Sequence, residues 1–213
     1  MKEYPKIETV FNRDTEGTKK LIPYSWRDDT VKYLSMNNWI FTEKVDGTNV
    51  RVQWDGHEIT FAGRTDKAQI PKGLQQALND IFLGDPVEQL FEQMFGEKQV
   101  IFYGEGYGGK IQKVGPLYGK YEDFILFDIY MPEKDLWLKR EDVESIAKAF
   151  DLNVVPIIFS GSIELAIDFV KGHPTSYINK NAPMEGVVGR PAVELKNREG
   201  ERVIVKIKVK DFE

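Results

Sequence analysis

The sequence predicts a mixed α/β fold, in the α+β sense, built from mostly antiparallel sheets with helices packed against them. Residues 39–64 have the pattern of strand, loop, strand, turn and strand, with Asp55-Gly56 as a hairpin turn. Residues 124–130 form a nearly continuous apolar run, which is typical of a strand inside a sheet. Strand-like and helix-like segments alternate irregularly with hairpin-like links, and this favours antiparallel sheets over a doubly wound parallel sheet.

Apolar spacing along the rest of the chain places the other elements. Residues 100–103 form a strand that runs into the glycine-rich stretch 104–109, and the first 38 residues are a mixed lead-in around one short helix. Helices are expected at residues 28–34, 74–95 (with a break near Gly84-Asp85-Pro86), 139–150 and 163–172, and closing strands at 184–190 and 202–209.

Composition excludes several functional classes. The 213 residues are 41% hydrophobic, with no apolar run long enough for a membrane helix and no signal-peptide core. We therefore expect a cytoplasmic protein without membrane association. The chain has no cysteine, and its two histidines lie far apart, so disulfides, thiolate metal sites and a Ser-His triad are not expected. A net charge of −5 argues against a protein that coats nucleic acid but allows a local basic groove.

Lys44 is the most informative residue. It lies in Glu43-Lys44-Val45-Asp46-Gly47-Thr48-Asn49, between the apolar run 39–41 and the next strand, where Gly47 allows close approach of the backbone. A lysine at the mouth of a sheet is a candidate covalent nucleophile if its neighbours promote loss of its proton. The alternative is a surface lysine before a turn.

Two further segments carry polar or aromatic groups that a nucleotide would use. Glu105 is flanked by glycines, so its carboxylate is a candidate for binding ligand hydroxyls, although it also fits an ordinary loop glutamate. Phe127 lies in an apolar run, where it either stacks on a base or packs in the core.

The last segments suggest sites for cations and anions. Glu185 opens a Gly-Val-Val strand and is a candidate ligand for a divalent cation near phosphate, or else a strand-edge charge. Strand alternation puts Lys206, Lys208 and Lys210 on one face, where they either bind phosphates or protect a solvated edge strand.

In this order, these segments resemble the motifs of the covalent nucleotidyltransferase superfamily of polynucleotide ligases and mRNA capping enzymes. Within it, the chain is most similar to the ATP-dependent RNA ligases of the phage type, because Thr48-Asn49 follow the glycine of the lysine motif. The other matching motifs are Gly63-Arg64-Thr65, Phe102-Tyr103-Gly104-Glu105, Phe124-Ile125-Leu126-Phe127-Asp128-Ile129, Glu185-Gly186-Val187-Val188 and Lys206-Ile207-Lys208.

The resemblance implies an adenylyltransferase-type core that binds the nucleotide between its sheets, and it implies roles for ten residues. Lys44 is the catalytic nucleophile and carries AMP. Glu185 orients Mg²⁺ or Mn²⁺, Glu105 binds ribose and Phe127 stacks on adenine. The remaining residues implied to bind the cofactor are Glu43 (through the neighbouring backbone), Asp46, Asn49, Arg64, Lys206 and Lys208.

The implied reaction is ATP-dependent RNA ligation. Lys44 forms a lysyl-AMP, the adenylate passes to an RNA 5′-phosphate, and a 3′-hydroxyl then seals the strand. An ordinary lysine has a pKa of about 10.4, so a nucleophilic lysine needs nearby positive charge or desolvation. Lys206, Lys208, Arg64 and Mg²⁺ are the expected sources of that charge.

Few residues precede Lys44 or follow Lys208, so we expect residues 1–213 to form one nucleotidyltransferase domain without an appended OB-fold or helical C-terminal domain. A partner protein or self-association would then supply the missing clamp on RNA. A minimal DNA ligase, a GTP-using capping enzyme and a catalytically silent protein that binds RNA ends are the alternative functions.

Overall fold

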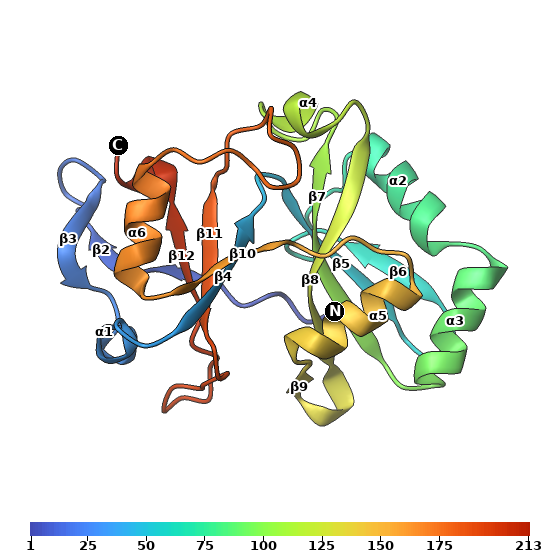
Figure 1. Ribbon diagram of the computed structural model, residues 1–213. Coiled ribbons are helices and arrows are strands. Elements are labelled where there is room, and N and C mark those ends of the chain that lie inside the picture. The colour runs from blue at the N-terminus through green and yellow to red at the C-terminus, as the bar shows by residue number, and fades with distance from the viewer. The chain divides into compact units, whose positions relative to one another are not determined.

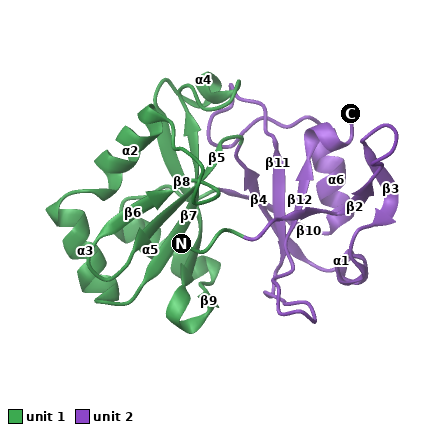
Figure 2. Ribbon diagram, turned by 180° about the vertical axis from the view of Figure 1, so that it is seen from behind, with its two compact units in different colours: residues 1–4, 46–155 green, residues 5–45, 156–213 purple.

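The computed structural model describes all 213 residues, which form two compact units (Figures 1 and 2). Unit 1 comprises Met1–Tyr4 and Asp46–Val155, and unit 2 comprises Pro5–Val45 and Pro156–Glu213. Each unit has its own hydrophobic core around its own five-stranded sheet.

The sheet of unit 1 is antiparallel throughout. Its central strand β7 (Val100–Gly108) pairs along its length with both neighbours. The strand order is β6 (Ile59–Ala62), β5 (Thr48–Trp54), β7, β8 (Glu122–Met131) and β9 (Leu136–Trp137).

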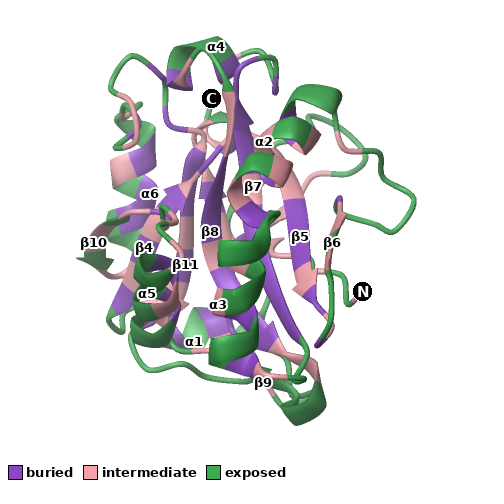
Figure 3. Ribbon diagram, turned by 90° about the vertical axis from the view of Figure 1, so that its right-hand side faces the viewer, coloured by how far each residue is buried: buried purple, intermediate pink, exposed green.

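Helices α2 (Lys72–Phe82), α3 (Asp85–Phe95) and α5 (Arg140–Ala149) supply apolar side chains to the core of unit 1. Leu74, Leu78 and Phe82 recur every fourth residue of α2, so one face of the helix is buried. Figure 3 shows β7 and β8 as mostly buried and α3 as largely exposed on its outer side. The short elements of this unit are α4 (Gly115–Tyr118) and the 3₁₀ turn η1 (Pro132–Lys134).

The sheet of unit 2 has the order β1 (Glu8–Thr9), β12 (Val205–Lys208), β11 (Gly186–Pro191), β4 (Trp39–Lys44) and β10 (Ile157–Gly161). Only the β1–β12 pair is parallel. Helix α6 (Ile163–Lys171) packs its apolar side on this sheet, and the Ser162 side chain caps its first turn. The remaining elements are the hairpin of β2 (Phe11–Arg13) and β3 (Leu21–Trp26), helix α1 (Asp29–Leu34) and the turn η2 (Val209–Asp211).

The predicted fold class is confirmed, since the fold is mixed α/β with mostly antiparallel sheets flanked by helices. The break predicted near Gly84-Asp85-Pro86 separates α2 from α3. The glycine-rich stretch after Tyr103 is strand rather than loop, because its backbone pairs with β5 on one side and β8 on the other. Conversely, β12 ends at Lys208, so Lys210 lies in the turn η2 and not on the strand face.

None of the helices has both the length and the apolar character that a membrane crossing requires.

Candidate active site

Three adjacent strands of unit 2 bring the predicted lysines together. Lys44 on β4 pairs with Gly186 on β11, which in turn pairs with Lys208 on β12. Two residues along, Lys206 occupies the same face by alternation. The intervening residues Glu43 and Ile207 are buried on the opposite face. The strand register therefore gathers three lysines on the side of the sheet that faces away from α6.

Glu185 joins this group through an ion pair. The Lys44 Nζ atom donates to Glu185 Oε2 at 2.5 Å, and the two side chains are 26% and 18% exposed. The Glu185 carbonyl accepts from the Val209 N–H at 2.9 Å, which fixes the residue against the end of β12. The candidate nucleophile is thus held in one orientation, with its amine engaged by a carboxylate.

Lys208 lies in an environment that disfavours its charge. Burial lowers its pKa from the ordinary value of 10.5, and the charges of Lys210 and Lys206 act in the same direction. The carboxylates of Asp211 and Glu185 oppose that shift. A partly desolvated ammonium group gains from a nearby anion, so this position favours phosphate binding.

Glu43 differs from its neighbour Lys44 because its side chain points into the core face. Its Oε2 atom accepts from the Tyr177 N–H at 2.8 Å. Burial raises its pKa, and hydrogen bonds from Ser176, Tyr177 and Ile178 counteract part of this effect. The Glu43 N–H donates to the Pro156 carbonyl at 3.0 Å. The Glu43 side chain therefore anchors the end of β4 within unit 2.

In unit 1, Asn49 and Glu105 face each other across β5 and β7. Both side chains lie on the face of the sheet opposite α2 and α3, because Val50 on β5 and Phe102 on β7, which alternation places on the other face, belong to the helix-covered core. The Asn49 Oδ1 atom is buried without a hydrogen-bond partner. Such an acceptor favours a bound donor, for example a ligand hydroxyl.

Gly47 allows the chain before Asn49 to lie close to strand β7. A Cβ atom at this position would collide with the carbonyl oxygen of Gly106 and would lie 2.8 Å from Glu105 Cγ. Only glycine fits the close approach of the segment that follows Lys44 to strand β7.

The loop that carries Arg64 is held by Arg51, a residue that belongs to none of the sequence motifs. Arg51 is completely buried on β5, and its guanidinium donates to the Gly63 carbonyl at 2.7 Å and to Asp66 Oδ1 at 2.9 Å. A third bond, to the Met1 carbonyl, is 2.6 Å long. Arg64 itself is exposed. The sequence signal for Arg51 was an arginine in a strand that otherwise alternates apolar residues.

Phe127 lies at an irregularity of β8. Tyr103 pairs with Asp128 and Gly104 pairs with Leu126, so Phe127 is the extra residue of a bulge. Its half-buried ring meets Tyr4 edge to face at 5.0 Å between centroids, and the Tyr4 hydroxyl donates to Asp128 Oδ2 at 2.9 Å. Phe127 packs against the cluster that contains Tyr103, and alternation along β7 places Tyr103 on the same sheet face as Glu105, so Phe127 lies on that face too.

Asp46 and Gly47 are held by two side chains that lie outside the sequence motifs. The Asp46 N–H donates to the Tyr118 hydroxyl at 3.4 Å, and Gln112 Nε2 donates to the Gly47 carbonyl at 3.0 Å. Tyr118 and Gln112 come from the segment between β7 and β8, which had no motif to mark it.

The side chains present fit a divalent cation only together with a phosphate ligand. The chain has no cluster of three or more acidic or histidine residues that would hold a metal ion alone. Glu185 provides one carboxylate beside lysines suited to phosphate, and Mg²⁺ is commonly held by one or two carboxylates plus substrate phosphates. This donor set is compatible with a cation that arrives with a nucleotide.

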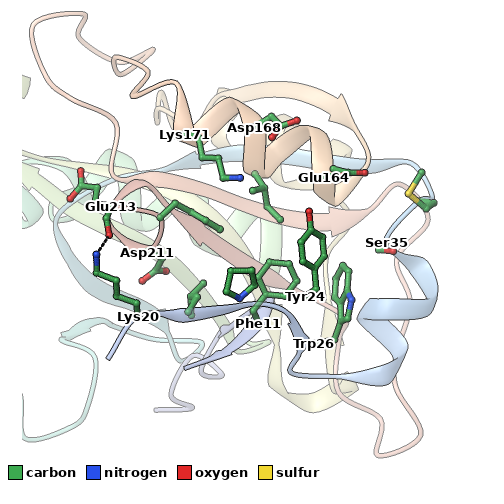
Figure 4. Close-up of a pocket in the computed structure, with 15 residues that line it drawn as sticks. Phe11, Lys20, Tyr24, Trp26, Ser35, Glu164, Asp168, Lys171, Asp211 and Glu213 are labelled. Carbon is green, nitrogen blue, oxygen red and sulfur yellow. Dashed lines mark hydrogen bonds between the residues drawn. The ribbon is translucent and has the colours of Figure 1, made fainter. Parts of the chain in front are cut away.

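A separate cavity of about 360 Å³ lies elsewhere in unit 2. Figure 4 shows the rings of Phe11, Tyr24 and Trp26 on one side of this cavity and helix α6, with Glu164 and Lys171, on the other. None of the lysines on the sheet face, nor Glu185, lines this cavity. It is therefore not the candidate active site.

Comparison with solved structures shows that the fold is similar to that of an RNA ligase. The chain is similar to Naegleria gruberi RNA ligase, including one mutant solved with ATP and Mn (TM-score 0.65, 20% identity). A second mutant, solved with AMP and Mn, gives a TM-score of 0.66 at 20% identity, and the same enzyme with PPi gives 0.63 at 21%. These matches cover 99%, 98% and 100% of this chain but 62%, 62% and 63% of the Naegleria chains.

A family model described as RNA ligase matches residues 37–208, which is most of the chain. The protein therefore belongs to the RNA ligase family. No curated protein matches it.

Proposed function

We propose that this protein is an ATP-dependent RNA ligase that joins 5′-phosphate and 3′-hydroxyl ends through a lysyl-AMP intermediate. The observation that carries the proposal is the group formed by Lys44, Glu185, Lys206 and Lys208 on one sheet face, in a chain of the RNA ligase family. A lysine nucleophile beside cationic side chains suits attack on a phosphate, because the cations stabilise negative charge that develops on the phosphate oxygens.

In the first step, the Lys44 amine attacks the α-phosphorus of ATP. A nitrogen–phosphorus bond forms, the bond from that phosphorus to the bridging oxygen breaks, and pyrophosphate leaves. Glu185 must first release the amine, since the ion pair engages the Lys44 Nζ atom that reacts. The amine then gives up a proton to solvent to become nucleophilic, while Lys206 and Lys208 bind phosphate oxygens.

Mg²⁺ or Mn²⁺, held by Glu185, would supply additional positive charge at the phosphates. ATP or AMP together with Mn is present in the Naegleria structures named above.

Residues of unit 1 would bind the nucleoside part of ATP. Glu105 accepts hydrogen bonds from the ribose hydroxyls, and the Asn49 Oδ1 atom accepts a further donor. The exposed ring area of Phe127 stacks on adenine, and the backbone beside Glu43 reads the edge of the base. Asp46 and Arg64 act near the phosphate groups of ATP.

In the later steps, AMP passes from Lys44 to the RNA 5′-phosphate, and the 3′-hydroxyl displaces AMP. We extend the proposal to residues 1–213 as one nucleotidyltransferase domain, with a partner protein or a second copy of the chain gripping the RNA.

Incubation of the protein with Mg²⁺ and α-labelled ATP tests the first step. We expect labelled protein with ATP, little label with GTP, and none with the Lys44→Ala variant. Lys210→Ala is the matched control, because this exposed lysine lies outside strand β12. Unlabelled wild-type protein, freed of bound AMP by prior treatment with pyrophosphate, would overturn the enzyme proposal and favour a silent protein that binds RNA ends.

Competition among nicked RNA, nicked DNA and single strands then tests the substrate. Sealing of RNA in preference to DNA supports the proposal. Equal or better sealing of DNA would replace it with a minimal DNA ligase.

A further inference from the structure

The segment between β7 and β8 is the most basic stretch outside the candidate active site. Residues 109–121, termed the basic loop, contain Lys110, Lys113 and Lys120 and no acidic residue, in a chain of net charge −5. All three lysines are exposed, and none forms an ion pair. Their positive charge is therefore available to a ligand.

The backbone of the basic loop is well defined. The chain turns through Gly108 and Gly109 with φ angles of +78° and +51°, which favour glycine, and the Gly109 N–H donates to the Gly119 carbonyl at 3.0 Å. Buried Ile111 packs into the core of unit 1, and the Tyr118 ring meets Tyr107 edge to face at 5.6 Å. These contacts fix the loop at its base and leave the lysines outside.

Glu122 follows the basic loop and bonds to the backbone of the loop rather than to a lysine side chain. Its Oε1 atom accepts from the backbone N–H of Lys110 at 3.1 Å. A Cβ atom on Gly109 would run into the same carboxylate, so Glu122 fills the inside of the turn.

The basic loop also contacts the segment that follows the candidate nucleophile. The Tyr118 hydroxyl accepts from the Asp46 N–H, and Gln112 donates to the Gly47 carbonyl. Asp46 and Gly47 are the second and third residues after Lys44. A strand bound along the loop would therefore pass beside Asp46 and Gly47 of unit 1.

Two exposed apolar side chains accompany the lysines. Tyr121 is 72% exposed and Leu117 is 44% exposed. The Lys120 Nζ atom lies 5.2 Å from the centre of the Tyr121 ring. Cations that contact phosphates, together with an exposed aromatic ring, are the elements by which proteins bind single-stranded nucleic acid.

We propose that the basic loop binds the RNA strand, with Lys110, Lys113 and Lys120 on backbone phosphates and Tyr121 stacked on a base. This inference rests on the proposed function, because it assigns a surface to the RNA substrate of the same reaction.

The test compares Lys110→Ala/Lys113→Ala/Lys120→Ala with Lys98→Ala/Lys134→Ala/Lys148→Ala, which removes three exposed lysines elsewhere in unit 1. Fluorescence anisotropy with a 5′-phosphorylated single-stranded RNA gives the Kd over a series of KCl concentrations. Each lost phosphate contact reduces the slope of log K against log salt by about 0.7 for single strands. We expect the loop variant to lose about two units of slope and the control variant to keep the wild-type slope.

Tyr121→Ala tests the stacking contact. Loss of one base-stacking contact weakens binding by about five- to 150-fold without changing the salt slope. Tyr121→Phe should bind like wild type, because it keeps the ring. Tyr33→Ala is the control, since that side chain is 85% exposed in unit 2.

Self-adenylation with labelled ATP is measured for every variant, because it needs no RNA and reports a folded nucleotide site. If wild-type protein takes no label, the proposed function fails while the binding comparison still stands. If wild-type protein labels itself and binds RNA, but the loop and control variants bind equally well, the assignment of the basic loop is wrong.

Discussion

The two units hold their polar residues in different ways. In unit 2, strand register alone places Lys44, Lys206 and Lys208 side by side, and the Glu185 pair joins them at a partly exposed position. In unit 1, a completely buried arginine, a strand bulge and a glycine contact position Arg64, Phe127 and the Asp46 segment.

This difference predicts which substitutions change the reaction and which change the stability of the protein. Polar side chains on an open sheet face contribute little to the free energy of unfolding, because they remain near water. Buried polar groups with several hydrogen bonds are costly to remove, because their former partners stay desolvated. Substitutions in unit 2 should therefore affect the reaction more than stability, and substitutions of the supports in unit 1 should affect both.

The largest expected effect is that of Arg51→Met. The substitution leaves the Gly63 and Met1 carbonyls without their donor. We expect the free energy of unfolding to fall by about 2–4 kcal/mol in urea titrations. The control Arg64→Met removes an exposed arginine from the loop and should change stability by no more than about 0.5 kcal/mol. Equal losses for the two variants would show that Arg51 is not the support of this loop.

Glu185→Gln should have the next largest effect, and on rate rather than stability. The variant keeps the shape of the side chain but loses its charge beside Lys44. We expect self-adenylation to slow by about 100-fold, as for removal of one electrostatic contact to a reacting group. The free energy of unfolding should change by less than about 1 kcal/mol, because the pair is partly exposed. A stable variant with the wild-type rate would show that Glu185 has no role in self-adenylation.

Gly47→Ala tests the close packing of the backbone in unit 1. The added Cβ atom meets the Gly106 carbonyl, so the backbone must shift at a cost of about 1–3 kcal/mol. Gly119→Ala is the matched control, since its φ of 180° suits any residue and its nearest neighbour lies 3.9 Å away. Thermal unfolding of both variants measures the difference, and a Gly47→Ala protein as stable as Gly119→Ala would contradict the close packing.

Lys208→Met should raise the free energy of unfolding slightly, whereas Arg51→Met and Gly47→Ala lower it. Burial lowers the pKa of Lys208, so its charged form costs stability at neutral pH and the folded state gains relative stability only as pH rises towards 10.5. Methionine removes that cost, and because solvent screens the partly exposed ammonium group we expect a gain of at most about 1 kcal/mol at pH 7, together with weaker labelling by ATP. Lys210→Met, at an exposed turn position, is the reference. A loss of stability would mean that the Lys208 charge is well compensated in the free protein.

The smallest effect is the pH dependence associated with Glu43. Because burial raises its pKa, this group contributes stability that is fully present below about pH 4.5 and is lost as pH rises through the folded value. The unfolding free energy of wild type relative to Glu43→Gln should fall over that window. Glu88→Gln, at an exposed carboxylate on α3, supplies the reference curve. A difference that rises with pH would contradict the direction of the shift.

Local pattern predicted much of the fold. Helical spacing located α2, α3, α5 and α6, and the Asp55-Gly56 signal located the turn between β5 and β6. The local sequence pattern gave the wrong element where hydrogen bonds to neighbouring strands determine the structure. The glycines around Glu105 resemble a loop, yet two neighbouring strands supply hydrogen bonds that extend β7 through Gly108. The short strands β1, β2 and β3 were missed because two to six residues carry too little periodicity to detect.

Prediction of the candidate site was uneven for the same reason. Motif order pointed to the ten residues proposed for the reaction, whose roles remain proposals. It did not point to Arg51, Tyr118 or Gln112, because their importance comes from contacts with residues distant in sequence.

Periodicity and motif order are properties of the chain, and they were enough to predict the fold class, the membership of the RNA ligase family and the face that Lys206 and Lys208 of β12 present. They did not predict that Gly186 lies opposite both Lys44 and Lys208 or that Glu185 pairs with the Lys44 amine, which the folded protein shows. The physical reason is that register between distant strands depends on the packing of a whole sheet, and no local stretch of residues encodes it.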